Sequence, residues 1–171
     1  LRHMGRRYRA QDFRQLMEDI RRAVPDVAIT TDVMVGFPGE AEDEHEESLR
    51  FCTEMDLADM HVFKYSRRDG TPAARLSEQV PENVKKRRSE EMLAVAANSA
   101  SRFRRRFLGQ SVLVLWEGVA EQQGTDDGDS VRPIWEGLTD NYLRVHAGAE
   151  ALLANRLIRA RLMAEWGDGL W

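Results

Sequence analysis

The amino-terminal half of the chain alternates between the hydrophobic pattern of a helix and that of a strand. Apolar residues of 11–24 recur at the i, i+3, i+4 and i+7 spacing of an amphipathic helix. Residues 27–35 then alternate as a strand does, a second helix runs to about Asp56, and a second strand covers 60–66. This order predicts part of a parallel α/β unit, with too few elements to close an eight-stranded barrel.

The predicted strand over 27–35 has two unlike faces. Val33 and Val35 belong to a mainly apolar face, whereas Thr30, Asp32 and Met34 lie on the opposite one. We expect helices to cover the apolar face and the other face to look into a lumen or cleft.

The carboxyl-terminal half has a different character. Residues 81–107 predict one long helix, which begins at a proline and ends before Gly109. A polar loop is expected over 121–130, and short strands are expected over 112–116, 137–145 and 155–163. Short strands separated by turn residues are typical of a small antiparallel barrel. The sequence therefore divides into 1–80, 81–107 and 108–171.

Composition narrows the class of protein. With 171 residues, 42% of them hydrophobic and 32% charged, the chain has the profile of a soluble folded protein. No apolar run approaches the roughly 20 residues of a membrane span, so no membrane partner is expected. The single cysteine, Cys52, cannot form an internal disulfide or hold a metal cluster, which suits a cytoplasmic protein. Most basic residues are arginines, which are common in nucleic-acid-binding proteins, although solvated helix faces have the same composition.

The strongest local signal is Gly36-Phe37-Pro38-Gly39, which directly follows the first predicted strand. Ligands of parallel α/β folds bind at the carboxyl ends of strands, and glycines bring the backbone close to whatever lies there. Free backbone N–H and C=O groups at this point can bind the edge of an adenine. An ordinary turn explains the same residues, so both interpretations stay open.

Residues 32–40 resemble the fifth-strand motif of radical S-adenosylmethionine enzymes, in which the strand end contacts adenine. Residues 1–8, 65–74 and 79–81 resemble one subfamily, the methylthiotransferases of the MiaB kind. The last third of the chain is similar to the TRAM domain of that family, a small RNA-binding barrel. Within it, 137–145 is most similar to the branch that modifies threonylcarbamoyl-adenosine in tRNA. The sister branches act on isopentenyl-adenosine in tRNA or on a ribosomal protein aspartate.

This resemblance implies a fold and a set of cofactors. The fold is the carboxyl-terminal portion of an open radical-SAM barrel (a partial TIM barrel), a connecting helix, and an OB-like TRAM β-barrel, in the three segments given above. The cofactors are S-adenosylmethionine and two [4Fe-4S] clusters. The cysteines that bind such clusters would belong to an amino-terminal part of the enzyme, because this sequence has none of them. The chain alone is therefore expected to be inactive.

The resemblance and the residue types together give two sets of candidates. The residues expected at the cofactor are Arg6, Asp32, Met34, Gly36, Phe37 and Pro38. The residues expected to bind a tRNA anticodon stem-loop are Arg102, Arg105, Arg106, Asn141, Tyr142 and Arg144. Each has a simpler alternative, such as a solvated arginine or a tyrosine ring that packs inward. No catalytic residue and no metal ligand is expected in this chain.

Two other functions agree with the same sequence. A non-catalytic RNA-binding module would bind tRNA in a salt-dependent way without iron chemistry. A small-molecule-binding α/β domain would have no affinity for tRNA.

Overall fold

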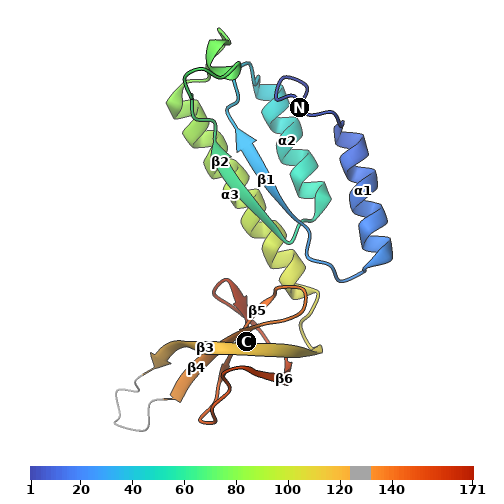
Figure 1. Cartoon of the computed structure of the whole chain (residues 1–171), viewed down its shortest axis with the longest axis vertical. Coiled ribbons are helices and arrows are strands. Elements are labelled where there is room, and N and C mark those ends of the chain that lie inside the picture. The colour runs from blue at the N-terminus through green and yellow to red at the C-terminus, as the bar shows by residue number, and fades with distance from the viewer. Residues whose placement is uncertain (124–131) are drawn as a thin grey trace. The chain divides into compact units, whose positions relative to one another are not determined.

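The computed structural model describes residues 1–123 and 132–171 and confirms the mixed α/β class (Figure 1). The chain forms two compact units, Leu1–Arg102 and Phe103–Trp171. None of the helices that the structure describes has the length and apolar character needed to cross a membrane.

The first unit contains a parallel pair of strands packed against helices. Its strands are β1 (Thr30–Val35) and β2 (Asp59–Lys64), paired in register along their whole length. Its helical elements are α1 (Ala10–Ala23), α2 (Glu42–Met55), the short 3-10 helix η1 (Ala73–Arg75) and most of α3 (Glu82–Arg105). The predicted order of helices and strands is confirmed. β1 begins later than expected, because the Val27 N–H closes a turn onto the Val24 carbonyl.

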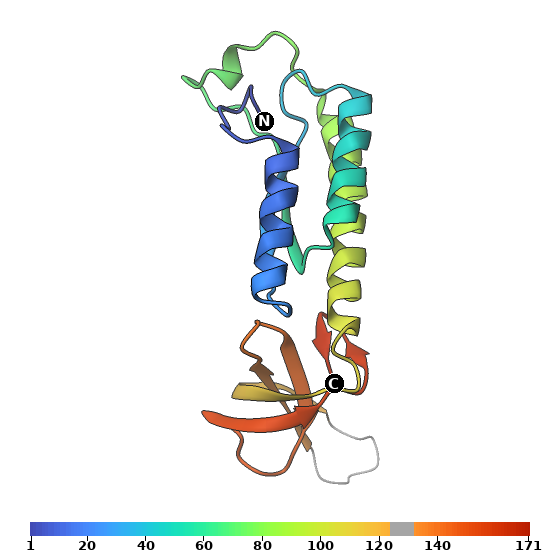
Figure 2. The same cartoon turned by 90° about the vertical axis from the view of Figure 1, so that its right-hand side faces the viewer.

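The core of the first unit lies between the strand pair and its helices. Met17 of α1, Cys52 of α2 and Met92 of α3 are buried in one cluster with Ile29 and Val35. Figure 2 shows α2 and α3 side by side. Each large apolar side chain buried here contributes about 1.5–3 kcal/mol. Helices therefore cover the apolar face of the strand, as the alternation predicted.

The second unit is a six-stranded sheet in the order β6-β3-β4-β5-β8-β7. The strands are β3 (Ser111–Gln123), β4 (Arg132–Leu138), β5 (Arg144–Gly148), β6 (Arg156–Arg161), β7 (Glu165–Trp166) and β8 (Gly169–Leu170). Neighbours are antiparallel except for β5 and β8, which are parallel, so the expectation of a wholly antiparallel unit needs this correction. Val114, Val145, Leu162 and Leu170 are among its most deeply buried side chains.

The predicted strand over 137–145 is wrong, because this segment holds the end of β4, a turn and the start of β5. The Leu143 N–H donates to Thr139 Oγ1 at 2.9 Å, and Tyr142 has a φ of 62°. A left-handed residue and a side-chain hydrogen bond reverse the chain here. β3 extends well beyond 112–116, and residues 124–130 of the expected polar loop lie outside the described residues.

Candidate functional site

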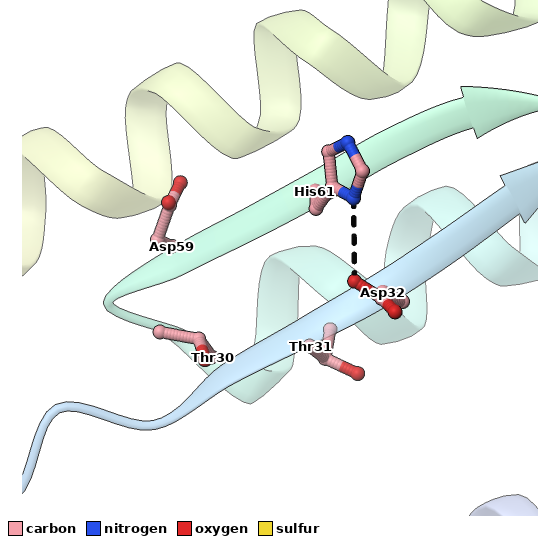
Figure 3. Close-up of a pocket in the computed structure, with 5 residues that line it drawn as sticks. All are labelled: Thr30, Thr31, Asp32, Asp59 and His61. Atoms are coloured by element: carbon pink, nitrogen blue, oxygen red, sulfur yellow. Dashed lines mark ion pairs between the residues drawn. The ribbon is translucent and has the colours of Figure 1, made fainter.

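One face of β1 and β2 is not covered by helices and carries three cross-strand pairs. These are Thr30 with Asp59, Asp32 with His61, and Met34 with Phe63. Asp32 Oδ1 and His61 Nδ1 face each other at 3.4 Å across the strands (Figure 3). Both side chains are more than three-quarters exposed, so the pair itself adds little stability. The open face changes from polar to apolar towards the carboxyl ends of the strands.

An open hollow of about 370 Å³ lies over the polar part of this face (Figure 3). It is lined by Thr30, Thr31, Asp32, Asp59 and His61. Of the residues expected at the cofactor, only Asp32 lines it. Ligands of parallel α/β folds bind at the carboxyl ends of strands, whereas this hollow lies nearer the amino ends. It is therefore distinct from the predicted adenine site.

The strand-end loop, residues 36–40, is bonded to itself and to a neighbouring segment. The Gly36 N–H donates to Glu40 Oε2 at 2.5 Å. The Gly39 N–H donates to the Glu78 carbonyl at 2.7 Å. The expectation that these N–H groups are free to bind an adenine edge is therefore wrong at Gly36 and Gly39. Their donors are already used to hold the loop.

What the strand end offers to a ligand is mainly apolar surface. Met34 and Phe37 are half-buried, and Pro38 is fully buried behind them. The Phe37 ring meets the edge of the Tyr65 ring at 5.5 Å between centroids. The Tyr65 hydroxyl is buried without a hydrogen-bond partner among the described residues. A buried hydroxyl that is left unpaired is costly to the folded state.

Arg88 of α3 anchors the strand-end loop from behind. Its side chain is 3% exposed. Its Nη1 donates to the Glu40 carbonyl at 2.9 Å and to Glu40 Oε2 at 2.8 Å, and its Nη2 donates to Glu42 Oε2 at 3.0 Å. Because Glu40 Oε2 also accepts the Gly36 N–H, Arg88 holds both ends of the loop through one carboxylate. Hydrogen bonds from Arg88 and Arg87 lower the pKa of Glu42.

Arg88 is not among the residues expected at the site, because the candidates on the helix over 81–107 all lie near its carboxyl end. The spacing of Arg88 from the apolar residues of the helix could have identified it as buried. Arg88 lies four residues from Val84 and four from Met92, on the same stripe of the helix. An arginine on an apolar stripe is buried only when carboxylates or carbonyls pair with it, so it indicates a structural ion pair.

Arg6 belongs to the exposed segment before α1. Within the described residues, no hydrogen bond or ion pair joins its side chain to residues 36–40.

Three of the arginines expected to bind RNA are paired with carboxylates. Arg102 Nε lies 2.9 Å from Asp56 Oδ1, and Arg105 Nε lies 2.5 Å from Glu165 Oε2. Arg144 contacts Glu136 at 2.9 Å and Asp168 at 3.4 Å. Each of them would have to exchange a carboxylate for a phosphate, which reduces the gain from binding RNA.

The remaining RNA candidates differ in their surroundings. Arg106 lies over the rings of Phe103 and Phe107 at 5.3 and 5.8 Å. Asn141 Oδ1 accepts a hydrogen bond from Thr139 Oγ1 within the turn. Tyr142 is 81% exposed, so its ring does not pack inward and is open to stack on a base.

Cys52 has no metal partner within the described residues, in which no group of three or more His, Cys, Asp or Glu side chains can hold an ion. Burial raises the pKa of its thiol to about 11. The side chain belongs to the core of the first unit.

Comparison with known proteins decides the family. No family model matches the chain. A tRNA-2-methylthio-N(6)-dimethylallyladenosine synthase of Thermobifida fusca is 45% identical over 127 residues, which are 74% of this chain and 25% of that protein. A synthase of the same name from Acetivibrio thermocellus is 36% identical over 162 residues, 95% of this chain and 32% of that protein. By sequence, the chain belongs to the tRNA methylthiotransferase family.

Both tRNA branches of this methylthiotransferase family are represented among the relatives. A threonylcarbamoyladenosine tRNA methylthiotransferase of Bacillus subtilis, MtaB, is 31% identical over 163 residues, 95% of this chain and 35% of that protein. The chain spans between a quarter and about a third of the length of these curated relatives. The resemblance stated from the motifs is thereby confirmed at the level of the family.

Proposed function

We propose that this chain is part of a tRNA methylthiotransferase, in which it forms one edge of the cofactor pocket and binds the tRNA. The observation that carries the proposal is the 36% identity with a tRNA-modifying synthase over 95% of the chain. A match of that length includes residues of both compact units. In this proposal 1–80 is the end of an open radical-SAM barrel, 81–107 a connecting helix and 108–171 a TRAM barrel.

The residues at the strand end fit the apolar side of an S-adenosylmethionine site. Met34 and Phe37 would flank the adenine, and Gly36 and the buried Pro38 would give the loop its shape. Asp32 would lie further along the open face, and Arg6 would contact the cofactor or substrate. Bound at an iron–sulfur cluster, this cofactor supplies a radical and a methyl group. The two [4Fe-4S] clusters would be held by cysteines outside this chain, which alone would be inactive.

The proposed substrate is an N6-modified adenosine beside the anticodon, which receives a methylthio group at C2. Segment 137–145 favours threonylcarbamoyl-adenosine. The names of the two relatives with 45% and 36% identity favour dimethylallyl-adenosine instead. In this proposal the enzyme acts in the cytoplasm on the anticodon stem-loop.

The test begins with the DNA that precedes the codon for Leu1. The proposal expects an open frame encoding Cys-x-x-x-Cys-x-x-Cys and further cysteines. The complete reading frame is then expressed in bacteria that lack their own methylthiotransferases, and the tRNA nucleosides are analysed by mass spectrometry. A methylthio derivative of either N6-modified adenosine supports the proposal and identifies the substrate.

The matched variants are Phe37→Asp, which should abolish the product, and Leu93→Asp on the exposed side of α3, which should not. A frame without cluster cysteines, together with salt-dependent tRNA binding, would instead identify a non-catalytic RNA-binding module.

A further inference from the structure

The edge strand β6 carries arginines that differ from those considered so far. Arg156, Arg159 and Arg161 are all exposed. None of the three forms an ion pair with a carboxylate of the described residues, and the contact between Arg159 and the Ser111 carbonyl is long, at 3.4 Å. Elsewhere in the second unit, Arg105 and Arg144 each have a carboxylate within 3 Å. Within the described residues, these three arginines of β6 can therefore bind a phosphate without giving up a carboxylate partner.

The strand register places two of these arginines on one surface with exposed leucines. Arg159 lies opposite Leu113 and Arg161 opposite Ser111, while Leu157 lies opposite Leu115. Alternate residues of paired strands share a face, so these side chains all lie on one side of the β3–β6 pair. Leu113, Leu115 and Leu157 are 46%, 42% and 63% exposed. We name this surface the β6 face: Arg159, Arg161, Leu113, Leu115 and Leu157.

β6 also lies at an open edge of its sheet. It pairs with β3 on one side and ends the strand order on the other (Figure 1). An edge strand presents backbone N–H groups that are not used in the ladder. Backbone N–H groups and arginines are the donors that most often contact phosphate oxygens.

We propose that the β6 face is the surface that binds the RNA backbone, with Arg159 and Arg161 on phosphates and the leucines against ribose and base faces. The two arginines lie two positions apart on an extended strand, about 6.6 Å, so they can follow one strand of RNA. This inference rests on the proposed function. It moves the main electrostatic contact from Arg102, Arg105 and Arg144 to β6.

Two other roles explain the same features and are separated by experiment. Charged residues on an edge strand block pairing with another sheet, and exposed leucines can bind a second protein surface. Neither role predicts a change in affinity for RNA when the arginines are neutralised.

The experiment measures binding of a fluorescent anticodon stem-loop RNA to the full chain at several salt concentrations. For the double variant R159Q/R161Q we expect affinity to fall about 10- to 40-fold at about 0.1 M salt, and the slope of log K against log salt to fall by about 1.5. Arg105→Gln and Arg144→Gln should each have a clearly smaller effect. The charge-matched control R22Q/R50Q changes two arginines on α1 and α2 that are paired within their own helices, and should leave affinity unchanged.

Two outcomes would overturn the inference, and a further measurement identifies the alternative role. If the unaltered chain does not bind RNA at all, the proposed RNA role fails and this inference fails with it. If the chain binds RNA and R159Q/R161Q binds equally well, only the inference fails. If that variant also self-associates in sedimentation, the arginines protect the sheet edge instead. Circular dichroism of each variant checks that an exposed substitution has not unfolded the chain.

Discussion

Gly36 is required to be glycine for two separate reasons. Its φ of 72° lies in the left-handed region, and a Cβ at this position would clash with the Cγ of Lys85. Gly70 provides the control, because its φ is also positive, at 85°, while nothing lies within 4 Å of the position of its Cβ. We expect Gly70→Ala to cost about 1 kcal/mol from backbone conformation alone. Gly36→Ala should cost about 2–4 kcal/mol, because overpacking adds to that strain.

Urea unfolding of the two glycine variants measures the difference. Equal losses for Gly36→Ala and Gly70→Ala would show that Lys85 moves aside without cost. In that case the close packing of α3 on the strand-end loop would contribute nothing to the choice of glycine.

The Cys52 thiol makes stability depend on pH in the alkaline range. Burial raises its pKa from an ordinary value of 9.0 to about 11 in the folded chain. The folded state therefore favours the neutral thiol, and this contribution is fully present below about pH 9. It is lost as pH rises from 9 through 11, by up to about 2–3 kcal/mol. The free energy of unfolding of Cys52→Ala should fall less steeply over that range than that of the unaltered chain. Parallel slopes would contradict a buried thiol.

At the scale of single residues, burial could be predicted from the sequence but ion-pair partners could not. The buried side of Val35 followed from strand alternation, because burial of one face is a local pattern. The partners of the arginines did not follow from any local pattern. Arg105 is separated from Glu165 by 60 positions, so only the folded chain brings them together. For this reason the sequence did not reveal that three predicted RNA contacts, Arg102, Arg105 and Arg144, are paired with carboxylates.

At the scale of elements, the contact between α3 and the strand-end loop is the main feature that the sequence pattern did not predict. Arg88 is buried and joins Glu40 to Glu42, whereas Arg87, its neighbour, pairs with Glu42 and Glu91 at the surface. Replacing Arg88 by Gln leaves the largely buried Glu40 carboxylate without its charge partner, so we expect a loss of up to about 3 kcal/mol. Arg87→Gln removes the same charge from the same helix and should cost far less, because its ion pairs are solvated.

Chemical denaturation at neutral pH compares the Arg88 and Arg87 variants directly. The structural account requires Arg88→Lys to recover only part of the loss, because an ammonium group cannot reach both carboxylates and the Glu40 carbonyl as a guanidinium does. Similar stabilities for Arg88→Gln and Arg87→Gln would mean that the loop holds its shape without α3.

The helices and the parallel strand pair were predictable, and the turn between β4 and β5 was not. Hydrophobic periodicity identifies an element whenever one of its faces is buried, as in α1 and β1. Periodicity does not detect a chain reversal that depends on one threonine hydroxyl and on one tyrosine with a left-handed backbone conformation. Residues 137–145 alternate well enough to suggest a strand, yet Thr139 and Tyr142 turn the chain within them. The same turn leaves Tyr142 exposed, which the strand interpretation did not predict.

At the scale of the whole chain, the boundary between the units makes a further prediction. The sequence division begins the last segment at residue 108, whereas the second compact unit begins at Phe103. Phe103 and Phe107 are each 3% exposed, with ring centroids 5.3 Å apart. Arg104 and Arg105 of the same stretch pair with Glu165. The end of α3 is thus part of the core that the small sheet needs.

We therefore expect a chain of residues 103–171 to fold alone and a chain of residues 108–171 to be strongly destabilised. Loss of a buried phenylalanine costs about 3–5 kcal/mol, and the shorter chain loses two of them, a large fraction of the stability of a small domain. Thermal unfolding and the dispersion of amide NMR signals measure the difference. If 108–171 is as stable as 103–171, the end of α3 does not belong to this core. If 103–171 folds and binds the stem-loop RNA as tightly as the full chain, the second unit carries the RNA surface by itself.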